Sequence, residues 1–296
     1  MERIFHYTIS EKENNMPIDS FLRSMGYSRQ NITALKAMPE SILVNGRWEY
    51  VIYKLKTGEH LTIHIQETES SPNIVPTPLP LSIVYEDADI LVVDKPAGMS
   101  IHPSQNHYEN TLANAVMHYY ASQNIPYTFR CINRLDQDTT GLTILAKHMY
   151  SASILSDMVA KREIKREYLA IVSGTGLETE GTVNAPIARL NGSTIERTVD
   201  EVNGTPSITH YKVLLEVGEY SLLSLWLETG RTHQIRVHMK HIGHPLPGDF
   251  LYHPDMRYIN RQALHSHRLT FAHPITKELL VFESPLPEDM QFIYTL

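Results

Sequence analysis

The proline-rich segment of residues 67–80 constrains the fold of this chain more than any other feature. Its prolines are Pro72, Pro76, Pro78 and Pro80. Proline fixes one backbone dihedral and lacks the N–H that helices and central strands require, so an extended, semi-stiff linker is expected here. The sequence therefore predicts a small N-terminal module at residues 1–66 and a large domain at residues 81–296.

The N-terminal module shows helix signals followed by strand signals. Apolar residues between Pro17 and Met25 share one helical face, and Ser28 is placed to cap a second helix. Asn45-Gly46 is a strong hairpin signal after a short apolar run. His60 to Ile65 alternates in hydrophobicity, which is typical of a strand. Two helices, a hairpin and a last strand are therefore expected in this module.

The large domain mixes strand and helix patterns and shows no internal repeat. Apolar runs predict strands at residues 81–85, 90–93, 165–172 and 222–227. Helical spacing of apolar residues predicts helices from Asn110 or Thr111 to Tyr119 and from Ser151 to Lys161. These patterns indicate many strands but do not give their order in a sheet.

The segment from Cys131 to Lys147 carries the strongest candidate for chemistry. Arg134 and Asp136 lie just before Gly141, after which an alternating apolar run predicts a half-buried strand. A carboxylate beside an arginine, ahead of a rigid strand, is well placed to act on a substrate. An ordinary polar loop between strands explains the local pattern equally well, because loops commonly carry carboxylates.

Composition limits the function classes. The chain has 296 residues, one cysteine and a formal net charge of −7 at pH 7. This charge argues against a nonspecific nucleic-acid binder, although residues 161–166 and 231–240 form basic clusters. A single cysteine excludes an intramolecular disulfide. With neither a signal peptide nor an apolar run long enough to span a bilayer, a soluble cytoplasmic protein is expected.

Four histidines raise the question of a metal site. They are His233, His238, His241 and His244. Their spacing matches no ligand motif of zinc or iron. No metal is therefore expected.

The Cys131 segment resembles a family signature. Arg134-Leu135-Asp136, followed by Thr139-Thr140-Gly141-Leu142, is similar to the motif of the RluA-type pseudouridine synthases. That family usually has histidine before the arginine and serine before the glycine. This chain has Asn133 and Thr140 there, while the arginine, aspartate and glycine are intact.

Further segments match the same family in the same order. Asp94 to Gly98, with His102-Pro103 after it, is similar to the opening motif of the family. Lys165 to Val172 matches the segment that holds the active-site tyrosine, and Glu228 to Gly248 matches the arginine-bearing motif. Leu264-His265 and His273-Pro274 match its last motif. Together the matches extend over nearly the whole chain beyond residue 80.

The resemblance implies isomerisation of uridine in structured RNA, with ribosomal RNA favoured over transfer RNA, on a monomeric α+β enzyme. The implied fold is a mixed, largely antiparallel sheet crossed by a basic cleft. The implied catalytic residues are Asp136 as nucleophile, Arg231 as the guanidinium that keeps it charged and oriented, and Tyr168 as stacking group and general base. Arg134 would fill the space that the flipped base leaves, and Ile235 would form the apolar floor. No cofactor is required.

Alternatives remain open at this point. Tyr168 fits equally the pattern of a core tyrosine whose hydroxyl is hydrogen-bonded. A catalytically inactive RNA-binding or assembly protein would have the same fold, and Asp136 with Asp138 formally suggests a two-carboxylate glycosidase. Those two carboxylates lie on one loop, however, whereas glycosidase pairs flank the substrate.

The N-terminal module resembles an S-four-type RNA-binding module in layout, with few basic residues on its second helix. Because the proline-rich linker separates it from every candidate catalytic residue, deletion of residues 1–66 is expected to leave a folded protein.

Overall fold

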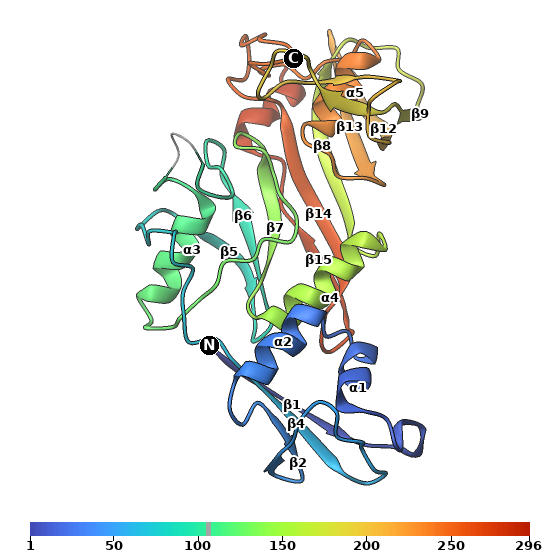
Figure 1. The fold of residues 1–296 in the computed structure, drawn as a ribbon. Helices are drawn as coiled ribbons and strands as arrows, with labels where there is room; N and C mark the ends of the chain where they lie inside the picture. The colour runs from blue at the N-terminus through green and yellow to red at the C-terminus, as the bar shows by residue number, and fades with distance from the viewer. Residues whose placement is uncertain (105–107) are drawn as a thin grey trace.

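The computed structural model describes residues 1–104 and 108–296. In Figure 1 the N-terminal module lies at one end, a long sheet passes through the middle of the molecule, and α5 with β12 and β13 lies at the other end. No helix in the described part of the chain is long and apolar enough to cross a lipid bilayer.

The N-terminal module is a four-stranded antiparallel sheet with two helices. Its strands, in spatial order, are β1 (Glu2–Thr8), β4 (His60–Gln66), β2 (Ile42–Val44) and β3 (Arg47–Trp48). Its helices are the short η1 (Glu11–Glu13), α1 (Ile18–Ser24) and α2 (Arg29–Ala37). The two main helices, the hairpin and the last strand confirm the sequence prediction. β1 was not predicted, because Phe5 is its single buried residue and no clear alternation marks it.

Local chemistry explains two of these elements. The Ser28 hydroxyl accepts a hydrogen bond from the backbone N–H of Asn31, and the Asn31 side chain accepts one from the backbone of Ser28. This reciprocal cap starts α2. Asn45 and Gly46 have φ values of 50° and 77°, the left-handed pair that a tight hairpin between β2 and β3 requires.

The large domain is built on a nine-stranded sheet. Eight strands follow the order β5-β6-β7-β14-β8-β13-β12-β9, and β15 pairs with β14. Their bounds are β5 (Ser82–Glu86), β6 (Ile90–Lys95), β7 (Thr140–Ala146), β8 (Lys165–Ser173), β9 (Glu180–Asn184), β12 (Ile208–Val217), β13 (Tyr220–Leu227), β14 (Leu264–Ala272) and β15 (Leu279–Glu283). The β7–β14 pair is parallel and the other pairs are antiparallel, which confirms a mixed, largely antiparallel sheet.

A small hairpin and four helices complete the large domain. They are β10 (Ile187–Arg189), β11 (Arg197–Val199), α3 (Leu112–Ala121), α4 (Met149–Ala160), α5 (Gln234–His241) and η2 (Glu288–Tyr294). The sequence predicted α3 and α4 but not α5. Its preceding residue, His233, is in the left-handed region at φ 59° and makes no capping hydrogen bond through its side chain, so no start signal marks this helix.

Strand β7 is buried on both sides rather than half-buried as predicted. It lies between β6 and β14, and every residue from Gly141 to Ala146 is buried. Gly141 has φ 107°, and a Cβ there would lie 2.3 Å from the carbonyl oxygen of Ser266. Glycine is therefore required for β7 and β14 to approach each other beside the Asp136 loop.

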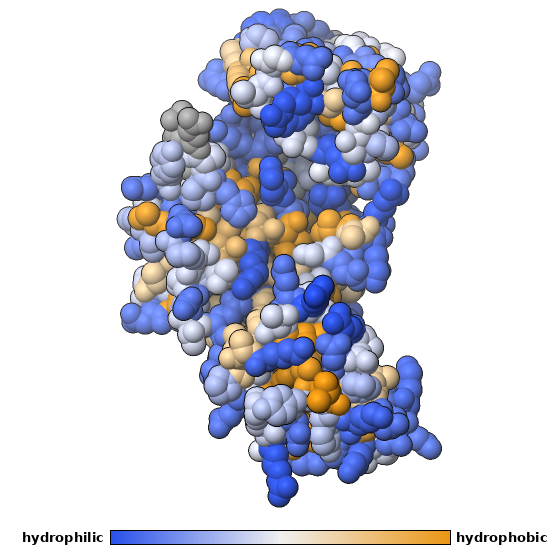
Figure 2. All heavy atoms as spheres, viewed as in Figure 1, coloured by the Kyte–Doolittle hydropathy of each residue, from blue (hydrophilic) through white to orange (hydrophobic). Residues whose placement is uncertain are grey.

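The module and the large domain share one hydrophobic core. Residues of the module such as Phe5 and Leu22 belong to the same buried cluster as Ile90 and Leu142 of the large domain. Tyr27 stacks on Tyr150 of α4 with ring centroids 3.8 Å apart. In Figure 2, hydrophilic residues cover most of this face, whereas hydrophobic ones gather around α4 and the module helices. This shared core argues against the expectation that deletion of residues 1–66 leaves a folded protein.

The proline-rich segment has no helix or strand, as predicted, but it is fixed to the large domain. The Glu67 carboxylate pairs with Arg130 at 2.8 Å. Asn114 of α3 donates a hydrogen bond to the carbonyl of Val75 and accepts one from the backbone N–H of Thr77. The segment is therefore a strap along α3 rather than a free tether.

Candidate active site

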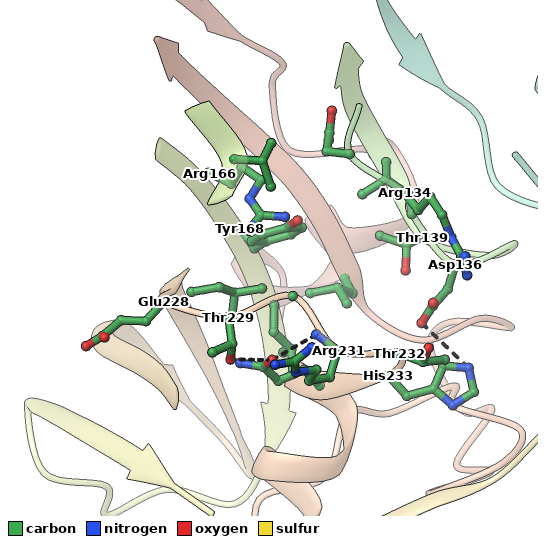
Figure 3. Close-up of a pocket in the computed structure, with 18 of the residues that line it drawn as sticks. Arg134, Asp136, Thr139, Arg166, Tyr168, Glu228, Thr229, Arg231, Thr232 and His233 are labelled. Carbon is green, nitrogen blue, oxygen red and sulfur yellow. Dashed lines mark hydrogen bonds and ion pairs between the residues drawn. The ribbon is translucent and has the colours of Figure 1, made fainter. Parts of the chain in front are cut away.

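A pocket of about 580 Å³ opens where the Asp136 loop faces the ends of α4, β8 and β13 and the start of α5 (Figure 3). All five residues predicted to act on the substrate line this pocket: Asp136, Tyr168, Arg231, Arg134 and Ile235. They come from segments up to a hundred residues apart in the sequence. The fold therefore brings the predicted residues into one cavity.

The Asp136 carboxylate is held by Arg236. The Arg236 guanidinium donates a hydrogen bond of 3.0 Å to Asp136 and two more, of 2.6 and 2.8 Å, to the buried Asp249. Burial opposes the charge on Arg236, but the hydrogen bonds to Asp249 and the nearby Asp136 carboxylate hold its pKa above the ordinary value. Asp249 thus fixes the Arg236 guanidinium through two hydrogen bonds, and the remaining N–H edge of the guanidinium faces Asp136.

This geometry corrects the predicted role of Arg231. Its backbone N–H donates to the Gln234 side chain at 3.0 Å, but its guanidinium forms no hydrogen bond or ion pair with any described residue. Arg231 and Arg236 belong to the same basic segment, and α5 turns the second of them toward Asp136. The exposed Arg231 side chain at the pocket wall is instead available to an external anion.

Tyr168 presents its ring to the pocket from β8. Its hydroxyl has no hydrogen-bond partner among the described residues, unlike the core tyrosine of the alternative interpretation. Burial raises the pKa of the phenol, the Arg166 guanidinium lowers it, and the Asp136 carboxylate raises it further. An ordinary phenol is already neutral at physiological pH, and the raised pKa leaves this side chain neutral, which suits stacking.

The Asp136 loop is fixed from below by two buried cations. The Lys95 ammonium donates hydrogen bonds of 2.8 Å to the carbonyls of Pro96, Met99 and Gln137. Arg261 donates to the carbonyl of Asp138 at 3.2 Å. Both cations thus donate hydrogen bonds to backbone carbonyls just after Asp136. These bonds hold the loop in place and preorganise the carboxylate.

The environment of Lys95 contains two opposing influences. Burial lowers the pKa of Lys95 to about 7, while Asp138 and Asp136 act in the opposite direction. Three donated hydrogen bonds require the three N–H groups of the ammonium form, because a neutral amine has two. The contacts therefore favour the charged form in the folded state. Lys95 is part of the matched opening motif, but no role was predicted for it.

Asn133, where the family usually has histidine, ties the loop to β7. Its side-chain oxygen accepts the backbone N–H of Ile144 at 2.8 Å, and its amide donates to the carbonyl of Leu142 at 3.2 Å. Thr143 adds a hydrogen bond of 2.6 Å to the Asn133 carbonyl. Asparagine is accommodated in place of the usual histidine because its side-chain amide both donates to and accepts from the backbone of β7.

Three of the four histidines of the basic segment have protein partners of their own, and the fourth, His241, is exposed. His238 is bonded to Thr209 and to the carbonyl of Ala185 at 2.9 Å each, and His244 lies 3.1 Å from the Ser173 carbonyl. His233 lies 3.9 Å from Asp136, and burial lowers its pKa. These contacts orient the rings toward protein groups rather than toward a common centre.

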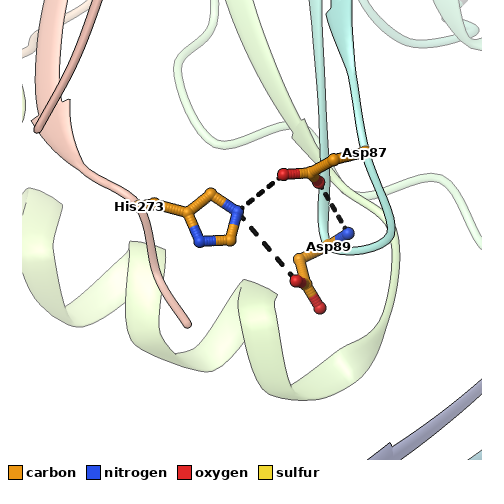
Figure 4. A group of neighbouring side chains, drawn as sticks. All are labelled: Asp87, Asp89 and His273. Carbon is orange, nitrogen blue, oxygen red and sulfur yellow. Dashed lines mark hydrogen bonds and ion pairs between the residues drawn. The ribbon is translucent and has the colours of Figure 1, made fainter. Parts of the chain in front are cut away.

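Asp87, Asp89 and His273 form a different cluster, at the junction with the module (Figure 4). Backbone N–H groups of Ile275 and Thr276 donate to His273 Nδ1, so Nε2 carries the proton of the neutral ring. That Nε2 lies 2.8 Å from Asp87, in poor hydrogen-bond geometry. A metal ligand would need the Nε2 lone pair, so the cluster fits an electrostatic contact better than a metal site.

Comparison with known proteins agrees with this site. The family model described as RNA pseudouridylate synthase matches residues 89–241, which include the Asp136 loop, β8 and α5. The chain is 40% identical over 275 residues to the Bacillus subtilis protein named uncharacterized RNA pseudouridine synthase YjbO, covering 93% of this chain and 97% of that one. It is 36% identical to ribosomal large subunit pseudouridine synthase D of Escherichia coli strain K12, covering 96% and 91%.

A solved structure shows the same fold. Human RNA pseudouridylate synthase domain containing 1 aligns with a TM-score of 0.58 and 29% identity, covering 70% of this chain and 83% of that one. The matches in sequence and in structure define an isomerase of the pseudouridine synthase class. The chain belongs to the RNA pseudouridylate synthase family.

Proposed function

We propose that this chain converts specific uridines of structured ribosomal RNA to pseudouridine, with Asp136 as the nucleophile. The observation that carries the proposal is the Asp136 carboxylate at the mouth of a pocket, hydrogen-bonded by an arginine that Asp249 fixes in place. Relatives named for the large ribosomal subunit support ribosomal RNA as the substrate class. The intact pocket argues against an inactive RNA-binding protein.

The reaction needs an ionised carboxylate aimed at a flipped-out uridine. The bond between the ribose anomeric carbon and N1 breaks, the base rotates, and C5 bonds to the anomeric carbon before losing its proton. Arg236 stabilises the carboxylate as an anion and fixes its direction. Extraction of the base from a stem costs a few kcal/mol, and the volume of the pocket suits one nucleotide.

The other pocket residues receive roles that match their chemistry. Tyr168 stacks on the uracil ring as a neutral phenol, and Ile235, which is 4% exposed, forms an apolar floor. Arg134, exposed at the rim, fills the space that the base leaves and stacks on its neighbours. Arg231 contacts a phosphate. No step requires a cofactor, because the reaction neither transfers a group between molecules nor changes an oxidation state.

We assign the N-terminal module to the S-four-type RNA-binding modules and propose that the enzyme acts as a cytoplasmic monomer. Two helices against a sheet support the assignment. Arg29, Lys54 and Lys56 have no carboxylate partner among the described residues, so they are available to RNA phosphates. Arg23, by contrast, pairs with Asp19.

The test is the Asp136→Asn variant, assayed by release of tritium from uridine labelled at C5 in ribosomal RNA. We expect isomerisation to fall by about four orders of magnitude or more, as for other lost nucleophiles. RNA affinity and melting temperature should stay close to those of the unchanged protein. Asp138→Asn is the matched control and should retain activity. Turnover by Asp136→Asn near the normal rate would refute the mechanism.

A further inference from the structure

A second groove, of about 610 Å³, begins at the rim of the active-site pocket and continues on the other face of the sheet. The two cavities share the residues at this rim, among them Arg162, Arg166 and Glu228. Consecutive strand residues point to opposite faces, and Tyr168 lines the pocket whereas Glu167 lines the groove. A strand of RNA leaving the pocket over this rim would enter the groove.

Trp226 is the aromatic residue of this groove. It is 42% exposed, unusual for so large an apolar side chain. The His210 ring stacks against one face of the indole, with centroids 5.5 Å apart and planes inclined by 18°. In the sheet register Trp226 lies between His210 on one strand and Glu167 on the other. The second face of the indole is therefore turned toward Glu167 and the groove.

Arg268 lies on the far side of Glu167, and its guanidinium pairs with Glu283 through Nε at 3.2 Å. It pairs in register with Glu167, so Arg268 and Trp226 stand two strand spacings apart. That distance is roughly 9.5 Å, which admits one planar base between an indole and a guanidinium. Stacking of unpaired bases on aromatic rings and on guanidinium planes is the usual mode of recognition of single-stranded RNA.

The charges of the groove also suit a nucleotide. Lys165 and Arg166 line it and have no carboxylate partner among the described residues. Glu167 accepts a hydrogen bond from the Ser224 hydroxyl at 2.8 Å through one oxygen, and its other oxygen is unbonded within the described chain. The groove thus offers cations for phosphate and a free carboxylate oxygen at its floor, while Glu228, which also lines it, pairs with Arg162.

We propose that this groove binds an unpaired nucleotide next to the target uridine and selects a base with an exocyclic amino group. The base stacks on Trp226, its amino group donates to Glu167, and its phosphates contact Lys165 and Arg166. Uracil is disfavoured because its single N–H lies between two carbonyl oxygens, which the carboxylate repels. This inference rests on the proposed function, since it takes RNA as the substrate.

Intrinsic fluorescence provides a direct test, because the chain has two tryptophans, Trp48 and Trp226. Trp48→Phe leaves Trp226 as the only indole, and Asp136→Asn in the same protein prevents turnover. This protein is titrated with ten-nucleotide oligoadenylate and oligouridylate, with N-acetyltryptophanamide as a control for light absorption. We expect saturable quenching, with oligoadenylate bound about tenfold more tightly. An unchanged emission with both oligonucleotides would overturn the proposal.

The Glu167→Gln variant tests the selection. Glutamine presents an amide that bonds uracil as well as adenine, so the tenfold preference should disappear while quenching remains. A preference unchanged in this variant would overturn the role of Glu167.

Kinetics separates this inference from the proposed function. On an RNA that the unchanged enzyme modifies, Trp226→Ala should raise KM about tenfold and leave kcat unchanged. Trp48→Ala is the matched control, an exposed tryptophan on the module, and should not reproduce this effect. An unchanged KM for Trp226→Ala would contradict the groove. The binding experiment needs no turnover, so failure of the Asp136 chemistry leaves its result intact.

Discussion

The cations at the junction with the module are paired with carboxylates, whereas most cations at the rim of the active-site pocket are not. At the junction Arg3 pairs with Asp89, and Arg130 pairs with Glu67. At the rim Arg162 pairs with Glu228, but Arg134, Arg231 and Arg166 have no carboxylate partner among the described residues. The difference indicates that the junction cations hold the protein together, whereas the rim cations are available to an external anion.

This contrast explains how a chain with a net charge of −7 can bind RNA. The net charge counts paired and unpaired groups alike, but a paired cation contributes little potential at a distance. Unpaired guanidiniums concentrated at one rim create a local positive surface on an acidic protein. Charge placement, rather than total charge, therefore sets the RNA-binding character.

The strongest test of the junction is removal of the module. Deletion of residues 1–66 should expose the shared core around Ile90 and Leu142 and yield an unfolded or aggregated chain, measured by circular dichroism and size-exclusion chromatography.

The milder Tyr27→Ala should lower the free energy of unfolding by about 3 kcal/mol. Tyr50→Ala, at a position 65% exposed, is the control and should change it little. A truncated chain with a normal melting temperature would show that the shared core is dispensable.

The next test compares two arginines of one segment. Arg236→Lys should lower the single-turnover rate by about a hundredfold, because lysine cannot bond Asp249 with two donors while also bonding Asp136. Arg231→Lys should keep that rate within a few-fold, since a phosphate accepts an ammonium. Rapid-quench measurement at saturating RNA gives both values. Equal losses in both variants would show that Arg231 acts on the nucleophile after all.

Salt dependence separates rim cations from junction cations. Arg166→Gln should reduce the slope of the logarithm of RNA affinity against the logarithm of salt concentration by about one unit, the loss of one phosphate contact. Arg130→Gln should leave this slope unchanged and lower the melting temperature instead. Filter binding across a salt series measures both variants. A slope altered by Arg130→Gln would place that residue on the RNA path.

The smallest effect concerns the junction at low pH. Burial opposes the charge of Asp89, but hydrogen bonds from His148 and Arg3 outweigh it and lower its pKa to about 2. The unfolded chain takes up this proton near pH 4, so the stabilisation is complete above that pH and is lost as the pH falls toward 2. Within this window stability should fall by at most about 1.4 kcal/mol per pH unit through this group.

Denaturant unfolding between pH 4 and pH 2 measures this contribution. Asp89→Asn should lower stability at neutral pH and remove part of the pH dependence in that window. Asp157→Asn, in an exposed ion pair with Lys161, is the control and should change neither. An unaltered pH dependence in Asp89→Asn would show that the buried network does not contribute to acid sensitivity.

Local sequence was sufficient for the module helices and hairpin, for α3 and α4 and for five strands of the large domain, and the five predicted site residues share one pocket. It did not predict β9, β10, β11, β12, β14 or β15. Ser28 and Asn45-Gly46 specify a helix start and a turn through their own hydrogen bonds and dihedrals. Weaker local signals were missed, as in β1 with its single buried residue and in α5 with its uncapped start. In both cases packing against distant segments supplies the stability that the local pattern lacks.

The sequence by itself predicted the strand-rich composition of the large domain and five of the residues that line the pocket. The tertiary structure alone decided that Arg236 rather than Arg231 bonds Asp136. It also decided that Lys95 and Arg261 donate hydrogen bonds to the Asp136 loop. It decided, finally, that the module packs against the large domain through a shared core. The physical reason is the range of each interaction. Caps, turns and alternation act between near neighbours, whereas ion pairs and shared cores depend on which distant segments the fold brings within a few ångströms.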